Sequence, residues 1–282
     1  MTARSRARNL FAAAMLSALV APASASAAET DDTAALATAA QNPIANMISL
    51  PFQNNTLFGV GTDGKTANVL NIQPVVPITI GNWNVITRTI APLIYVPDLT
   101  AGLAELPSQD RENSKLGLGD INFSAYLSPA TSGEVIWGIG PSITFDSATS
   151  REIGSGKYST GPAAVVVLTP KPWVVGTLVR QLWSFAGDSD RDSVSQLLVQ
   201  PFVNYNFGEG WYAVSAPIIT ANWEAKRSAD TWLVPIGGGF GKIFSIAGQP
   251  MNASLQGYRM VESPKYGPNW EARFQLQFLF PK

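Results

Sequence analysis

The stretch from Asn269 to Phe280 alternates between apolar and polar side chains. The apolar positions are Trp270, Ala272, Phe274, Leu276, Phe278 and Phe280, the polar ones are Glu271, Arg273, Gln275 and Gln277, and only Leu279 breaks the pattern. Because successive strand residues point to opposite faces, the pattern predicts a two-faced β-strand. A soluble protein would bury the aromatic face in a core. A membrane barrel would turn it to lipid and its polar face to the lumen.

The N-terminus has the features of a secretory signal peptide. Arg4, Arg6 and Arg8 form a basic region, a short apolar run follows from Leu10 to Val20, and Ala25-Ser26-Ala27 is a small-residue cleavage site. This run is too short to span a membrane. We expect residues 1–27 to be a signal peptide, 28–44 a periplasmic N-terminal segment and 45–282 the barrel. A retained N-terminal anchor helix is the alternative.

Composition narrows the class of protein. Charged residues make up 14% of the chain, against about a quarter in soluble domains. Removing the three arginines of the signal leaves 16 basic and 20 acidic residues, a net charge of −4, which gives no reason to expect a nucleic-acid partner. After the signal, no apolar run reaches the roughly 20 residues of a membrane helix. Such a secreted chain points to β-structure in a cell envelope.

Twelve two-faced segments follow one another along the chain. They are Asn46–Gln53, Ala67–Ile80, Trp83–Val96, Ser114–Ser128, Glu134–Ser147, Lys157–Thr169, Trp173–Ala186, Ser193–Phe207, Trp211–Glu224, Thr231–Phe244, Pro250–Glu262 and Asn269–Phe280. Long polar connections, beginning with Asn54–Thr66, alternate with short ones such as Gly81-Asn82. Outer-membrane barrels have long external loops, short periplasmic turns and an even strand count. The pattern predicts an all-β, twelve-stranded antiparallel up-and-down transmembrane β-barrel in the Gram-negative outer membrane.

Aromatic and proline residues refine this expectation. Large aromatics lie near predicted strand ends: Trp83, Tyr95, Trp173, Trp183, Trp211, Trp223, Trp232 and Trp270. That location favours girdles at the two membrane interfaces over ordinary core packing.

Prolines fall inside strands at positions 74, 77, 92, 141, 162, 201, 217 and 235. Because proline cannot donate to the ladder, these positions predict bulges, kinks or shorter strands.

The chain resembles a known family in several stretches. They are Q-N-P-I-A-N-M-I-S-L-P-F-Q-N-N at Gln41–Asn55, N-V-L-N-I-Q-P-V-V-P-I and T-R-T-I-A-P-L-I-Y after it, and the closing W-E-A-R-F-Q-L-Q-F-L-F. Together they resemble outer-membrane transporters grouped with phenol-degradation (meta-pathway) outer-membrane proteins. The resemblance implies passage of small aromatic or hydrophobic solutes. The last strand also resembles the signal read by the barrel-insertion machinery, although Pro281 and Lys282 follow the final aromatic residue.

Catalytic and cofactor signals are weak. The chain has no His and no Cys, which removes the commonest general base and any thiolate ligand. Gly237-Gly238-Gly239 lacks the Gly-Lys-Ser/Thr ending of a phosphate loop and indicates a thin or bent strand. The acidic run Gly187–Asp192 lacks the glycine and glutamate of a calcium loop. We predict no enzyme activity and no catalytic, cofactor-binding or metal-binding residue.

The remaining chemistry belongs to the barrel interior. Strand parity, and the cost of placing Arg against lipid, predict a lumen lined by Arg88, Asp120, Asn122, Tyr126, Arg180, Gln196, Gln200, Asn204, Arg259, Glu271, Arg273, Gln275 and Gln277. We expect Arg88, Arg180 and Arg259 to be paired with lumen acids. Twelve strands lie between a filled barrel and a water channel. Two functions stay open: passive uptake of small solutes, or a non-conducting structural or surface-interaction barrel with a filled interior. The predicted partners are outer-membrane lipid, a small solute and the insertion machinery.

Overall fold

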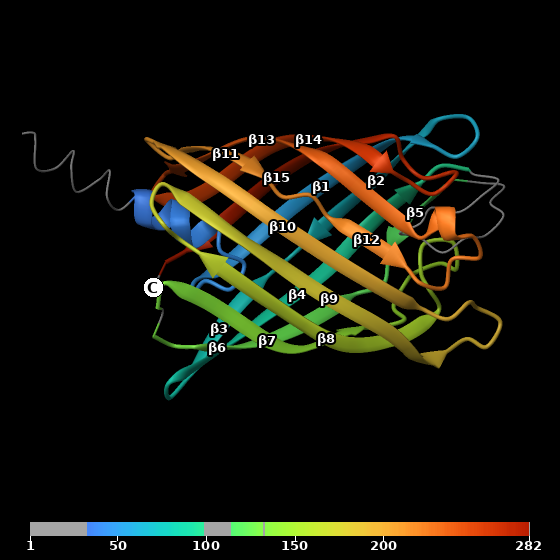
Figure 1. The fold of residues 1–282 in the computed structure, drawn as a ribbon, viewed down its shortest axis with the longest axis horizontal. Helices are drawn as coiled ribbons and strands as arrows, with labels where there is room; N and C mark the ends of the chain where they lie inside the picture. The colour runs from blue at the N-terminus through green and yellow to red at the C-terminus, as the bar shows by residue number, and fades with distance from the viewer. Residues whose placement is uncertain (1–32, 99–113, 132, 282) are drawn as a thin grey trace, which may run out of the picture.

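The structure is a computed structural model that describes residues 33–98, 114–131 and 133–281. Its strands run side by side, tilted, around a closed barrel (Figure 1). In chain order the elements are a helix at 33–40, β1 Ile48–Val60, β2 Lys65–Ile72, β3 Val75–Ile80, β4 Trp83–Val96, β5 Lys115–Leu118, β6 Asn122–Pro129, β7 Val135–Thr144, β8 Lys157–Leu168, β9 Trp173–Gly187, β10 Ser195–Gly208, β11 Trp211–Ser215, β12 Ile219–Asn222, the 3-10 turn η1 Ser228–Asp230, β13 Trp232–Ile246, β14 Gln249–Glu262 and β15 Trp270–Phe280. The predicted signal peptide lies outside the described residues.

Three of the wall strands are interrupted, so the fifteen segments form twelve wall strands. β2 and β3 both pair with β1 and β4, β5 and β6 both pair with β4, and β11 and β12 both pair with β10 and β13. All of these pairings are antiparallel. The barrel closes where β1 meets β15, in a register that runs from Ile48 opposite Phe280 to Phe58 opposite Trp270. The predicted twelve-stranded antiparallel barrel is confirmed.

Prolines account for some of the irregularity in the wall. Pro74 lies between β2 and β3, Pro217 lies between β11 and β12, and the register of β13 against β14 shifts at Pro235. These positions agree with the expected breaks and bulges, because a proline leaves one ladder donor missing. The other five predicted sites, at Pro77, Pro92, Pro141, Pro162 and Pro201, lie inside continuous strands instead.

One connection is shorter than the sequence predicts. The expected first strand ended at Gln53, with a long loop over Asn54–Thr66, but β1 runs on to Val60 and only residues 61–64 join it to β2. The predicted loop was wrong because its polar run Asn54-Asn55-Thr56 stays in the ladder. Each of these residues has a strand partner on both sides, in β2 and in β15.

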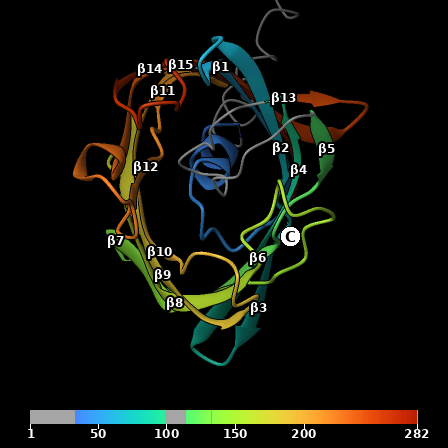
Figure 2. The same ribbon diagram turned by 90° about the vertical axis from the view of Figure 1, so that its right-hand side faces the viewer.

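The N-terminal segment packs inside one end of the barrel. The helix 33–40 and the C-terminus lie at the same end (Figure 1), and the view along the barrel shows the helix within the ring of strands (Figure 2). Ala37 packs in a buried cluster with Leu279 of β15, while Ile44 packs in another with Ile86 and Tyr126. Leu279 breaks the alternation of the closing strand because its inward apolar side chain is covered by this segment.

Candidate functional site: the barrel lumen

The outer wall of the barrel is apolar and carries aromatic rings near its ends. All eight aromatics expected in girdles are exposed: Trp83, Tyr95, Trp173, Trp183, Trp211, Trp223, Trp232 and Trp270. Between them the wall presents side chains such as Phe240 and Leu255, which are 62% and 64% exposed. In the described residues, no helix combines the length and apolarity needed to cross a membrane. An outward apolar surface of this extent suits lipid rather than water.

Two neighbouring cavities inside the barrel share part of their lining. The larger has a volume of about 780 Å³ and reaches from the lumen to loop residues such as Lys226 and Lys265. The smaller, of about 150 Å³, is lined in part by the inserted N-terminal segment. Five residues line both cavities, and we call them the junction residues: Gln53, Gln73, Arg88, Leu178 and Gln200. A solute crossing the barrel along this path must pass them.

Most of the predicted lumen residues line these cavities. Arg88, Asp120, Asn122, Tyr126, Arg180, Gln196, Gln200, Glu271 and Arg273 line the larger one, and Asn204, Gln275 and Gln277 line the smaller one. They come from β4, β6, β9, β10 and β15 and from the break before β6, so they surround the lumen. The sequence pattern predicted these positions because the inward residues of a barrel strand recur at every second position.

Arg259 is the exception, and its predicted inward orientation was wrong. Its side chain is exposed, while its neighbours Tyr258 and Met260 are buried. It lies three residues before Glu262, at the loop end of β14, with the outer-wall residue Trp270 opposite it. A long basic side chain near a membrane rim can extend its charge to the headgroups, so the cost of a mid-membrane arginine does not apply there.

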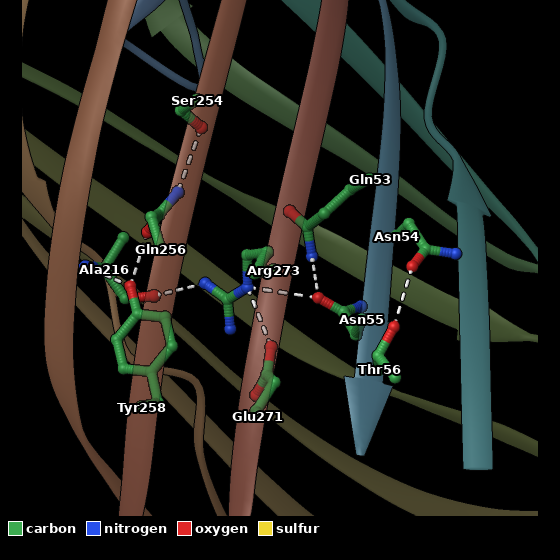
Figure 3. Close-up of polar contacts among 10 residues, drawn as sticks. All are labelled: Gln53, Asn54, Asn55, Thr56, Ala216, Ser254, Gln256, Tyr258, Glu271 and Arg273. Carbon is green, nitrogen blue, oxygen red and sulfur yellow. Dashed lines mark hydrogen bonds and ion pairs between the residues drawn. The ribbon is translucent and has the colours of Figure 1, made fainter. Parts of the chain in front are cut away.

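Arg273 is the centre of a buried polar cluster on the lumen wall (Figure 3). Its Nε donates hydrogen bonds to Glu271 Oε1 at 3.0 Å and to Asn55 Oδ1 at 3.1 Å. Its Nη1 donates to the carbonyl oxygen of Ala216 at 2.7 Å, and its guanidinium carbon lies 4.7 Å from the centre of the Tyr258 ring. The side chain is 1% exposed. Arg273 therefore joins β15 to β1, β14 and the break between β11 and β12.

Tyr258 also contacts the break between β11 and β12. The hydroxyl of Tyr258 accepts a hydrogen bond from the amide of Ala216 at 3.0 Å and donates one to Gln256 Oε1. The strand between them is β13, where Gly237 is the partner of Tyr258. A Cβ at Gly237 would lie 2.0 Å from the carbonyl oxygen of Gly257, so this position cannot carry a side chain without displacing the wall. The glycine run is thus a strand, as expected, and leaves room for the contacts that cross it.

The arginines of the lumen differ in their partners. Arg273 is paired with Glu271. Arg88 donates instead to the neutral amide oxygen of Gln73, and Arg180 has no ion pair with any carboxylate in the described part of the chain. The predicted pairing with lumen acids was therefore wrong for these two. Both of these arginines line the larger cavity.

Asp120 forms no ion pair with Arg88 or Arg180 in the described residues. Its carboxylate instead accepts hydrogen bonds from the loop that follows β7. Its Oδ1 accepts hydrogen bonds from the amides of Ser147 and Ala148, at 3.3 and 3.2 Å, and its Oδ2 accepts two from Ser155, both at 2.6 Å. Asp120 thus fastens the loop that follows β7. The described residues hold no cluster of three or more acidic side chains placed to bind a metal ion.

Sequence reasoning missed several lining residues. Gln53 and Asn55 alternate with outward neighbours along β1, but the second of them fell in the predicted loop. Gln73 lies in the break between β2 and β3, where parity gives no orientation. One sequence feature indicated that residues 33–47 enter the barrel. This feature is Leu279, an apolar residue at an inward position near the end of β15.

Comparisons with known proteins agree with this architecture. No family model and no curated protein sequence matches the chain. Among solved structures it is similar to the COG4313 outer membrane channel from Pseudomonas putida F1, with a TM-score of 0.60 and 15% identity over 83% of this chain and 94% of that one. It is also similar to the NanC porin, with a TM-score of 0.50 and 10% identity over 83% of this chain and all of that one.

The fold is that of an outer-membrane β-barrel. Similarity at such low identity shows the fold alone, and the predicted location in the Gram-negative outer membrane agrees with it. The apolar outer wall and polar lumen agree with it too. Membership of the phenol-degradation group stays a prediction.

Proposed function

We propose that this barrel is an outer-membrane channel for the passive uptake of small solutes, aromatic or otherwise hydrophobic compounds among them. The observation that carries the proposal is the polar-lined cavity of about 780 Å³ inside an apolar wall. A cavity of this size is within the range that accepts drug-sized molecules, about 300–1,000 Å³. The solute class rests on the resemblance of the sequence to the phenol-degradation group.

The lining suits solutes that carry both polar and apolar parts. Gln and Asn amides such as Gln196 and Asn122 alternate around the cavity with apolar side chains such as Leu178, Leu182 and Ile90. Amides offer both donors and acceptors, and apolar side chains accept a ring without a hydrogen-bonding cost. Diffusion down a concentration gradient needs no catalytic group, and the proposal assigns none.

One observation favours the alternative, a non-conducting structural or surface-interaction barrel. Residues 33–47 occupy the end that holds the short turns, and the cavity beside them measures only about 150 Å³. If this segment closes that end, solutes reach the junction residues from the loop side but cannot leave at the other end. Channel function therefore requires that the segment move or that a narrow path persist beside it.

Conductance of the purified barrel separates the two functions. The protein is refolded in detergent, its folding is checked by a shift in gel migration on boiling, and it is inserted into a planar lipid bilayer. The channel proposal expects discrete current steps, and liposomes containing the barrel should take up small aromatic solutes faster than empty liposomes. A folded barrel that gives neither current nor uptake would support the non-conducting alternative.

A further inference from the structure

Two arginines at the middle of the lumen have no acidic partner. Arg88 and Arg180 project inward from β4 and β9, and both line the larger cavity. Arg88 is also one of the junction residues, so its side chain borders both cavities. In the described part of the chain, neither forms an ion pair with a carboxylate, and both line the same cavity.

Two of the acidic residues that line the same cavity are held by other groups. Glu271 is bound to Arg273 at 3.0 Å, and Asp120 accepts four hydrogen bonds from the loop that follows β7. The amide of Gln73 meets Arg88 through its oxygen, which leaves the cation with its full charge. A guanidinium stays protonated at any physiological pH, so neither arginine can lose its charge by losing a proton.

Apolar side chains line the cavity beside this pair, together with the amides described above. Tyr126 lines the same cavity as both arginines. Leu178 precedes Arg180 by two residues and lies on the same face of β9, and Leu198 is the strand partner of Arg180 in β10. A ligand held by the arginines would therefore place its remaining atoms against one aromatic and two aliphatic side chains.

We propose that Arg88 and Arg180 form a binding site for the carboxylate of an organic anion with an apolar body, such as a benzoate-like acid, at the junction of the two cavities. Planar guanidinium groups bind carboxylates through paired hydrogen bonds. An anion bound in this cavity would also supply the negative charge that the two arginines lack. The inference rests on the proposed channel function and names its preferred solute class as aromatic carboxylates rather than neutral aromatics.

Ion selectivity tests the charge of the site. Reversal potentials are measured under a KCl gradient for the wild type, Arg88→Gln, Arg180→Gln, the double variant and Arg259→Gln. Arg259 is the matched control, because it lies on the outer wall. We expect the wild type and the control to favour chloride, each lumen variant to lose part of that preference, and the double variant to lose most of it. A double variant as chloride-selective as the wild type would overturn the site.

Binding in detergent tests the ligand without requiring conduction. Calorimetric titrations compare sodium benzoate, acetate and benzyl alcohol. We expect benzoate to bind most tightly, and the double variant to weaken it at least about tenfold, because both charged hydrogen-bond donors are lost. Benzyl alcohol binding as tightly as benzoate would overturn the role of the arginines. Acetate binding as tightly as benzoate would contradict the proposed role of the apolar part of the ligand.

The two measurements separate failure of this inference from failure of the proposed function. A folded barrel without conductance but with arginine-dependent benzoate binding would refute the channel and keep the anion site. A conducting barrel without benzoate binding would keep the channel and refute the site. Arg88→Lys serves as a folding control, since it keeps the charge while losing the paired hydrogen-bond geometry.

Discussion

The side-chain amides of Gln41 and Asn206 hydrogen-bond to each other in both directions. Gln41 Nε2 lies 2.8 Å from Asn206 Oδ1, and Asn206 Nδ2 lies 3.3 Å from Gln41 Oε1. Gln41 follows the helix 33–40, and Asn206 lies near the turn-side end of β10. The pair ties the inserted N-terminal segment to the barrel wall.

Loss of this pair should loosen the inserted segment. The chain has no cysteine, so an Ala37→Cys substitution reports access to the helix without background labelling. Ala37 is 2% exposed, and we expect slow reaction with a bulky maleimide in the wild-type background. Adding Asn206→Ala should speed labelling by roughly twofold to tenfold, because a hydrogen bond contributes about 0.5–1.5 kcal/mol. Gln41→Ala should have the same effect, and the combination should add little. Strictly additive effects would show that the two amides act separately.

The packing beneath the segment predicts a larger effect on stability. Leu279 is fully buried against it, whereas Leu255 points out from the wall and is 64% exposed. Leu279→Ala should lower the free energy of unfolding by about 2–5 kcal/mol, because it leaves a cavity. Leu255→Ala creates no cavity and should cost much less. Urea titration in lipid vesicles, followed by the gel shift on boiling, measures both. Equal losses would mean that the inserted segment does not cover Leu279.

The alternation of side chains was the strongest guide to the fold because the barrel has two different environments. Lipid selects apolar residues outside and the lumen selects polar residues inside, so each strand has a period of two. Trp270, Glu271, Arg273 and Phe274 all point as the pattern predicts. The number of two-faced segments predicted the number of strands. The alternation of long and short connections agreed with an up-and-down barrel.

The prediction from alternation failed at positions where the local environment differs from plain lipid outside or a polar lumen inside. Asn54 faces outward yet is polar, because its amide is satisfied by Asn68 on the next strand. Arg259 is charged yet faces outward, because it lies near the rim. Leu279 is apolar yet faces inward, because a segment from the other end of the chain covers it. In each case the reason is the position of the residue in the folded barrel, which the alternation within a single strand does not give.

Arg273 and Glu271 should show unequal effects when changed singly and together. Both are buried, at 1% and 6% exposure. Arg273→Leu leaves the Glu271 carboxylate buried without its partner and should cost about 3–5 kcal/mol in unfolding free energy. Adding Glu271→Gln should recover a large part of that loss. Urea titration of the two single variants and the double variant gives the coupling. If Glu271→Gln makes Arg273→Leu less stable, the ion pair is not the dominant contact.

Asn54 and Asn68 allow the same reasoning on the lipid-facing wall. Asn54 is opposite Phe274, which is exposed on the outer surface, and its Nδ2 donates to Asn68 Oδ1 at 2.8 Å. Asn68 Nδ2 donates back to Asn54 Oδ1 at 3.0 Å and also to Thr56 Oγ1 at 2.9 Å. The polar groups therefore satisfy one another, and none needs water.

Replacing one asparagine of this pair should be more harmful than replacing both. Asn54→Leu leaves part of the Asn68 amide unpaired next to lipid, where no water can replace the partner, and should cost about 1–3 kcal/mol. Asn54→Leu with Asn68→Leu removes both amides and leaves an apolar surface that lipid accepts, so the double variant should be more stable than either single variant. Unfolding of the three variants in lipid vesicles, beside the wild type, measures the difference. A double variant that loses the sum of the single losses would show that these amides contact something other than each other.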